Sequence, residues 1–221
     1  MNITFIKATS PEAPAKYLAD LITARLAAGQ RVLWLLSGGS CISVAIAAAK
    51  LLAGRNLAGL TVSLIDERYG PPGHADSNWA QLLAAGFELP GALLYPVLPA
   101  ADRATAADEF ASFLAEQFEA SDFVLGLLGI GPDGHTSGIK PHSPALTAPG
   151  LVAHYDWNDY QRITTTPAAL AKLDEAVVYL VGASKWPQLD RLETVLPPAD
   201  QPAQLLKTVL KLTIFTDRPE S

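Results

Sequence analysis

The chain has very little cysteine and no long apolar run. Only one of its 221 residues, Cys41, is a cysteine, so no internal disulfide can form, as is typical of a reducing compartment. No stretch approaches the roughly 20 apolar residues that cross a bilayer. The N-terminal segment also lacks the basic and apolar regions of a secretory signal. These absences predict a cytoplasmic protein that does not act within a membrane.

Charge is also sparse, and the balance is acidic. Charged residues make up 17% of the chain, and the formal net charge is -6. No basic stripe of the kind that binds nucleic acid is visible, so we expect no nucleic-acid partner. An acidic chain binds an anion only through a local cluster of donors. With 49% apolar residues and no repeat or low-complexity segment, residues 1–221 are expected to form a single domain.

Short apolar runs alternate with segments of helical periodicity. The expected strands are Arg31–Leu36, Thr61–Asp66, Phe123–Leu128, Ala176–Val181 and Leu210–Thr216. The expected helices are Ser40–Leu52, Asn78–Ala85, Thr105–Ala120 and Lys185–Val195. This alternation predicts an α/β fold, with a mainly parallel, Rossmann-like sheet and helices on both faces. Ligands of such sheets bind beyond the carboxyl ends of the strands.

A glycine-rich turn follows the first expected strand. Gly38 and Gly39 let the backbone approach a ligand closely, and the N-terminus of the following helix favours an anion. Ser40 offers a hydroxyl donor and a helix cap. Taken alone, the turn is equally well explained as a plain strand-to-helix connection. Arg68 and Lys185 also lie just beyond strand ends, and together these residues predict a phosphate-binding site.

A second glycine-rich turn presents a histidine. Residues Gly129–His135 read GIGPDGH and match the G-x-G-x-x-G pattern of dinucleotide sites. That interpretation is rejected because Pro141 and two further prolines leave no room for the helix that such a site requires. A free imidazole group titrates near neutral pH, so a histidine in this place is suited to general base catalysis, and His135 is the candidate base. Asp133 or Glu67 is expected to orient its ring or to stabilise the cationic form of the ring.

Other catalytic chemistries find little support. No H-E-x-x-H or Cys/His spacing occurs, so no metal is predicted. No G-x-S-x-G elbow occurs, which disfavours an acyl-serine route. Cys41 stands at the start of an expected helix, where its pKa would be lowered. Packing of a small residue after the turn is the favoured interpretation of Cys41.

Five motifs resemble the 6-phosphogluconolactonase family, in the family's order and over most of the chain. They are LLSGGS (35–40), IDERY with SN (65–69, 77–78), LGIGPDGHTS (128–137), RITTTP (162–167) and VGASKW (181–186). The resemblance implies a fold shared with glucosamine-6-phosphate deaminases. It also implies hydrolysis of 6-phosphogluconolactone in the oxidative pentose phosphate pathway, without a cofactor.

The resemblance also implies roles for single residues. His135 matches the base, and Ser40, Arg68 and Lys185 match positions around the phosphate. Asp66 and Arg162 lie in matching motifs and are expected at the substrate. The implied partner is a small phosphorylated sugar lactone, and the chain is expected to be a monomer or a small homo-oligomer.

The chain departs from the family pattern beside both glycine-rich turns. Cys41-Ile42 stands where the family has Thr-Pro, and Ser137–His142 replaces a stretch like ASLFPG. The deaminases have an acidic residue five positions after the histidine, whereas this chain has Lys140, which favours the lactonase. Two alternatives stay open: a non-catalytic sensor of sugar phosphates, and an enzyme such as an isomerase acting on another phosphorylated sugar.

Overall fold

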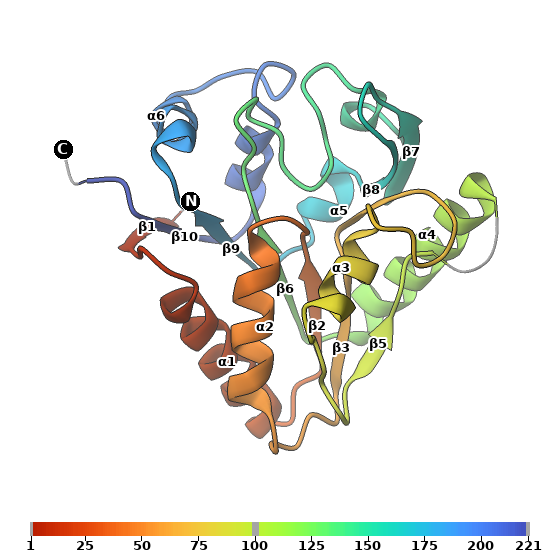
Figure 1. Ribbon diagram of the computed structural model, residues 1–221, viewed down its shortest axis with the longest axis vertical. Coiled ribbons are helices and arrows are strands. Elements are labelled where there is room, and N and C mark those ends of the chain that lie inside the picture. The colour runs from red at the N-terminus through yellow and green to blue at the C-terminus, as the bar shows by residue number, and fades with distance from the viewer. Residues whose placement is uncertain (1, 99–101, 220–221) are drawn as a thin grey trace.

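A seven-stranded sheet forms the centre of the computed structural model, which describes residues 2–98 and 102–219 (Figure 1). Its strand order is β1-β10-β9-β6-β2-β3-β5, and every neighbouring pair is parallel. The strands are β1 (Asn2–Lys7), β2 (Val32–Leu36), β3 (Leu60–Leu64), β5 (Leu93–Tyr95), β6 (Phe123–Leu128), β9 (Glu175–Leu180) and β10 (Lys211–Thr216). The predicted mainly parallel fold is confirmed.

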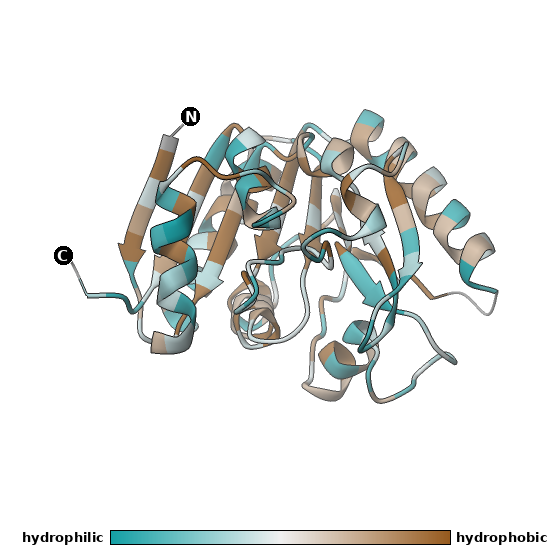
Figure 2. Ribbon diagram, turned by 90° about the horizontal axis from the view of Figure 1, so that it is seen from above, coloured by the Kyte–Doolittle hydropathy of each residue, from teal (hydrophilic) through white to brown (hydrophobic). Residues whose placement is uncertain are grey.

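The central strands are continuous apolar runs because the sheet is covered on both faces. Every residue of β2, β6 and β9 is buried. The helices are α1 (Glu12–Ala27), α2 (Cys41–Leu52), α3 (Asn78–Ala84), α4 (Arg103–Ala120), α5 (Pro167–Leu170) and α6 (Trp186–Glu193). Helices α1 and α2 lie on one face and α4 on the other (Figures 1 and 2).

Three short 3₁₀ helices complete the elements: η1 (Pro144–Leu146), η2 (Ala183–Lys185) and η3 (Pro202–Thr208). The expected helix from Lys185 thus begins one residue later as α6, with Pro187 in its first turn. The first strand and helix, β1 and α1, were not predicted. Within the described residues, no helix is long and apolar enough to cross a membrane.

A second sheet stands beside the carboxyl ends of the first. It contains β4 (Asp66–Arg68), β8 (Gln161–Thr165) and β7 (Val152–Asp156), all antiparallel. The expected single strand over Thr61–Asp66 is therefore wrong at its end. Strand β3 ends at Leu64, and the buried Ile65 bridges the two sheets through backbone hydrogen bonds with Leu36 and Thr165. This break carries Asp66–Arg68 over the edge where β2 and β6 end.

The strand order has a switch point between β2 and β6. From β2 the chain continues to β3 on one side, and from β6 it continues toward β9 on the other. The two connections leave in opposite directions, which opens a crevice at the carboxyl ends of these strands. Both glycine-rich turns of the sequence follow these two strands and therefore face the same crevice.

Candidate active site

A cavity of about 240 Å³ occupies this crevice. It brings together eight of the residues predicted for the site. From the first glycine-rich turn come Gly38, Gly39 and Ser40. The charged or titratable members are Asp66, Arg68, His135, Arg162 and Lys185. The remaining two candidates, Asp133 and Glu67, do not line the cavity and act on residues that do.

The first turn packs closely against the start of α3. A Cβ atom on Gly38 would lie 2.0 Å from Asn78 Oδ1, so only glycine fits there. Ser40 stands at the N-cap position of α2, but its side chain makes no capping bond, and the predicted cap is wrong. The residue already has helical backbone angles there, so its hydroxyl is not directed at the first-turn N–H groups. The Ser40 side chain instead lines the cavity.

Two arginines face the cavity from neighbouring strands. Arg68 on β4 and Arg162 on β8 are directly opposed in the antiparallel register. Like charges at such positions repel each other. The Asp159 carboxylate accepts two bonds from Arg162 Nη2, at 2.9 and 2.8 Å, and the Tyr160 ring lies 4.5 Å from the Arg68 guanidinium carbon. The buried Nε atoms of both arginines have no hydrogen-bond partner within the described chain. The pair therefore forms a site that a phosphate group would complete.

Glu67 does not touch His135, and its suggested role in orienting the ring is corrected. Its buried carboxylate accepts hydrogen bonds from the backbone N–H groups of Arg68 (2.7 Å), Asn78 (2.6 Å) and Trp79 (3.1 Å). The Ser77 hydroxyl donates a fourth bond at 2.8 Å. Burial raises the pKa of Glu67, and these bonds oppose that rise. Glu67 thus ties β4 to the N-terminus of α3 and positions Arg68.

His135 is held by Asp133, the other candidate. Its Nδ1 atom hydrogen-bonds Asp133 Oδ1, and its backbone N–H donates to the same oxygen at 3.2 Å. The turn requires glycine at position 131, because a Cβ there would lie 2.1 Å from the His135 ring. Partial burial alone would raise the pKa of Asp133, but the bonds from His135 and Lys140 outweigh burial and hold it well below its usual range. An ionised Asp133 fixes the tautomer in which Nε2 accepts a proton.

Lys140 joins this pair, although sequence reasoning gave it no role in the site. Its Nζ atom lies 3.1 Å from Asp133 Oδ2 and 3.1 Å from His135 Nδ1. The side chain is only 11% exposed and lines the cavity. Lys140 reaches His135 because the chain turns tightly at Ser137 and Gly138, which both have positive φ. This turn returns Lys140 toward the ring.

Asp66 is buried and lines the cavity. Burial raises the pKa of its carboxyl group, and the nearby charges of Arg162, His135, Arg68 and Lys140 oppose the rise. A Cβ on Gly138 would lie 2.8 Å from Asp66 Oδ2, so the turn that precedes Lys140 packs directly on this side chain. The cavity thus collects several cations around few acidic groups.

Cys41 is fully buried at the start of α2. Burial raises the pKa of its thiol to about 12, against a small opposing effect of Lys185. The favoured interpretation, a small packed residue, agrees with this environment, and Cys41 offers no thiolate for catalysis. Among the residues that the structure describes, no group of three or more His, Cys, Asp or Glu is arranged to hold a metal ion.

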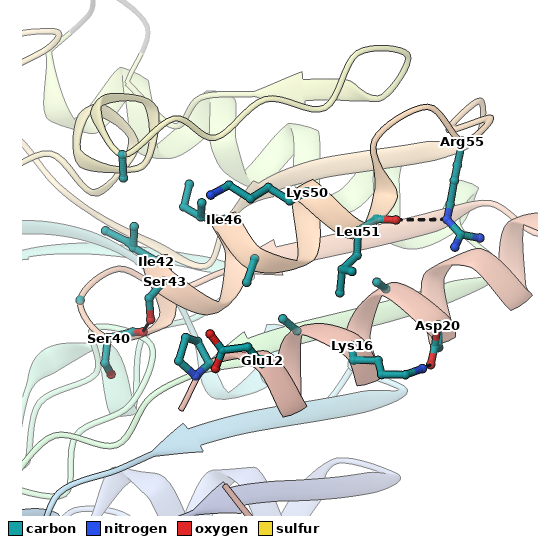
Figure 3. A pocket seen from close by; sticks show the side chains of 16 residues that line it. Glu12, Lys16, Asp20, Ser40, Ile42, Ser43, Ile46, Lys50, Leu51 and Arg55 are labelled. Carbon is teal, nitrogen blue, oxygen red and sulfur yellow. Dashed lines mark hydrogen bonds and ion pairs between the residues drawn. The ribbon is translucent and has the colours of Figure 1, made fainter. Parts of the chain in front are cut away.

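A larger hollow, of about 1120 Å³, lies along the outer side of α1 and α2 (Figure 3). Its walls are mainly alanine and aliphatic side chains. Three of its charged members are engaged locally: Lys16 pairs with Asp20, and Arg55 Nε donates to the Leu51 carbonyl. The hollow shares Gly39 and Ser40 with the smaller cavity but contains neither the histidine nor the arginines. The reactive groups therefore lie in the smaller cavity.

Comparison with known proteins gives a consistent result. The sequence profile described as glucosamine-6-phosphate isomerases/6-phosphogluconolactonase matches residues 7–214. A 6-phosphogluconolactonase from Rattus norvegicus is 30% identical over 86% of this chain and 83% of its own length. One from Synechocystis is 37% identical over 61% of this chain, and the matched part is 60% of that relative. The crystal structure of a 6-phosphogluconolactonase from Shewanella baltica superimposes with a TM-score of 0.82 at 22% identity, covering 97% of both chains.

Proposed function

This chain belongs to the glucosamine-6-phosphate isomerase/6-phosphogluconolactonase family, and on that premise we propose that it hydrolyses 6-phosphogluconolactone to 6-phosphogluconate. The reaction belongs to the oxidative pentose phosphate pathway. The observation that carries the proposal is the convergence, in one cavity, of a carboxylate-held histidine and a cross-strand arginine pair.

The substrate phosphate binds at Arg68, Arg162 and Lys185, with the SGGS turn beside them. Guanidinium groups match phosphate oxygens in a fork, and the unpartnered Nε atoms of both arginines are donors for such a ligand. The phosphate is remote from the reacting carbonyl, so its binding free energy orients the lactone ring without taking part in the bond changes.

Ring opening uses His135 as the general base. Asp133 accepts the Nδ1–H bond, which leaves the Nε2 lone pair free to take a proton from water as the water oxygen attacks the lactone carbonyl. The negative charge that develops on the carbonyl oxygen is stabilised by the surrounding cations. His135 then returns its proton to the ring oxygen as the carbon–oxygen bond breaks. The products are a carboxylic acid and a hydroxyl group, and no covalent intermediate or cofactor is needed.

The first prediction concerns the base itself. Replacing His135 with alanine should lower kcat by ~10²–10⁴-fold, the usual contribution of a general acid–base group, with little change in substrate affinity. The measurement is lactone hydrolysis near neutral pH, corrected for spontaneous opening. Near-normal turnover of the variant would remove His135 from this role.

The same assay separates the alternative functions. A wild-type protein that binds the phosphosugar but does not accelerate ring opening would be a sensor. Release of ammonia from glucosamine 6-phosphate would indicate a deaminase.

The second prediction concerns the phosphate. Arg68→Ala should raise KM for the phosphorylated lactone about 10- to 100-fold, as expected for loss of a charge-assisted hydrogen bond worth about 1.5–3 kcal/mol. Hydrolysis of the unphosphorylated gluconolactone should change little. Arg55→Ala is the matched control, since Arg55 lies outside the cavity. An equal loss on both lactones would contradict a phosphate contact at Arg68.

A further inference from the structure

We propose that Lys140 is a positioning residue for the general base: its ammonium group holds the Asp133 carboxylate and opposes protonation of His135, which keeps the ring able to accept a proton. This inference rests on the proposed function, because it concerns the same histidine. It assigns a role to the segment Ser137–His142, where the sequence departs from the family pattern.

The contacts divide the Asp133 carboxylate between two partners. Oδ1 accepts from His135 Nδ1, and Oδ2 accepts from Lys140 Nζ at 3.1 Å. The same Nζ lies 3.1 Å from His135 Nδ1, so the three groups form a closed triangle. Since the lysine side chain is 11% exposed, solvent screens its charge only weakly.

The chemistry of the three groups sets the direction of the effect. A carboxylate beside an imidazole favours the imidazolium, and an imidazolium cannot act as a base. An ammonium group at 3.1 Å has the opposite influence, because the protonated ring and Lys140 would be like charges in contact. Asp133 thus fixes the tautomer by accepting the Nδ1 proton, and Lys140 prevents the carboxylate from stabilising a second proton on the ring.

Three hydrogen bonds fix the segment that carries Lys140. Its turn is closed by the Ile139 N–H, which donates to the Thr136 carbonyl at 2.8 Å. The Tyr155 hydroxyl on β7 donates to the Gly138 carbonyl, and the Lys140 backbone N–H donates to that hydroxyl at 3.3 Å. The ammonium group therefore comes from a segment fixed by the second sheet.

Other charged groups face the same space and must be kept constant in any test. Asp66 on β4 interacts electrostatically with His135. The remaining charged side chains that line the cavity are Arg68, Asp159, Arg162 and Lys185. Within the described residues none of them hydrogen-bonds or forms an ion pair with His135, whereas Lys140 Nζ lies 3.1 Å from its Nδ1 atom. Substitution at position 140 therefore isolates the ammonium group in direct contact with the ring.

The kinetic test compares Lys140→Met, which removes the charge at similar length, with Lys140→Arg, which keeps it. The pH dependence of kcat/KM is measured from pH 5 to 8. We expect the acidic limb of the K140M profile to move to higher pH by about one unit, the size of shift that one nearby charge produces. Activity on that limb then falls about tenfold, while the K140R profile stays close to that of the wild type. A K140M enzyme impaired equally at every pH, with the limb unmoved, would overturn the proposal.

A second measurement does not depend on lactonase activity. Titration of the imidazole ¹⁵N signals by NMR reports both protonation and tautomer, and His135→Gln assigns the His135 signals. In the wild type we expect the proton on Nδ1, and in K140M we expect the ring to protonate at higher pH. If this shift occurs in a protein without lactonase activity, the proposed function fails, while the effect of Lys140 on protonation of the ring stands. If lactone is hydrolysed but neither the ring nor the pH profile responds, Lys140 has no such role. Lys140→Gln serves as the uncharged variant if K140M does not fold.

Discussion

At the scale of single residues, two carboxylates were predicted as partners of the His135 ring, and one of them, Asp133, contacts it. Asp133 and Glu67 are both acidic and both close to the site in sequence motifs, yet only Asp133 meets the imidazole. The difference lies in their neighbours. Asp133 faces a histidine and an ammonium group, whereas Glu67 faces backbone N–H groups at a helix N-terminus. The same carboxylate group thus holds an imidazole ring in one place and ties a strand to a helix in the other.

Asp133 should also contribute to stability in a pH-dependent way. Its folded-state pKa is lowered from the usual value near 3.8 by its bonds to His135 and Lys140, against the opposing effect of burial. A lowered pKa of an acid contributes stability above its unfolded pKa, and that contribution is lost as pH falls below about 4. The free energy of unfolding of Asp133→Asn should therefore lie below that of the wild type at pH 6.

The comparison is made by urea denaturation of both proteins between pH 6 and pH 3. The difference in unfolding free energy should shrink as the pH falls from about 4 to 3. The matched control is Asp76→Asn, which removes a carboxylate in the loop before α3. A gap between wild type and D133N that stays constant down to pH 3 would show that Asp133 makes no contribution through its charge.

At the scale of elements, the short strand β4 does more than extend a sheet. Its three residues point in two directions. Asp66 and Arg68 line the cavity, while Glu67 binds the start of α3. Alternation of side chains along a strand makes this division natural. Because Ser77 both donates to Glu67 and caps α3 through the Ala80 N–H at 3.0 Å, the strand and the helix are fixed as one unit.

Glu67→Gln tests this unit. In the wild type, both carboxylate oxygens of Glu67 accept hydrogen bonds from N–H and O–H donors. Glutamine replaces one of these oxygens with an NH₂ group, which cannot accept, so at least one buried donor loses its partner. We expect the free energy of unfolding to fall by about 1–3 kcal/mol. Since Arg68 and Asn78 depend on the same carboxylate, KM for the phosphorylated lactone should also rise. Urea denaturation and steady-state kinetics measure the two effects.

The outcome separates positioning from proton transfer. If Glu67 were the partner of His135, E67Q would lower kcat and shift its pH dependence. We expect kcat and its pH dependence to stay unchanged, and only KM and stability to respond. The control Glu88→Gln alters a carboxylate on another segment and should leave stability and KM unchanged.

At the scale of the whole molecule, two sheets meet at one edge. The parallel sheet supplies both glycine-rich turns, and the antiparallel sheet supplies the arginine pair. Neither sheet alone supplies all the residues that line the cavity. A ligand bound between them should therefore strengthen the contact of the two sheets and raise the stability of the whole chain.

Inorganic phosphate tests this coupling. At 100 times its dissociation constant, a ligand that binds only the folded protein adds about 2.7 kcal/mol to the unfolding free energy. For a chain of this size the Tm should rise by about 5–10 °C. Differential scanning calorimetry measures the shift at matched ionic strength. Arg162→Ala should reduce it, whereas Lys172→Ala, outside the cavity, should not. Equal protection by sodium chloride would argue against a specific anion site.

The sequence by itself determined most strands of the parallel sheet and the reactive groups. Strand β6 was predicted to the residue, and β2, β9 and β10 to within one, because buried parallel strands are written as local apolar runs. His135 and Arg68 were found from their positions after such runs. Both glycine-rich turns were recognised for the same reason: a backbone that approaches another group closely needs glycine at a definite place in the chain.

Only the tertiary structure decided how these groups combine. It separated Asp133 from Glu67, opposed Arg68 to Arg162 across two strands, and brought Lys140 to the imidazole. None of these contacts follows from local periodicity, which records which residues are buried but not what they meet. The partners come from segments that pair through a second sheet, and the chain enters that sheet by changing direction at Ile65, near the end of what reads as one strand.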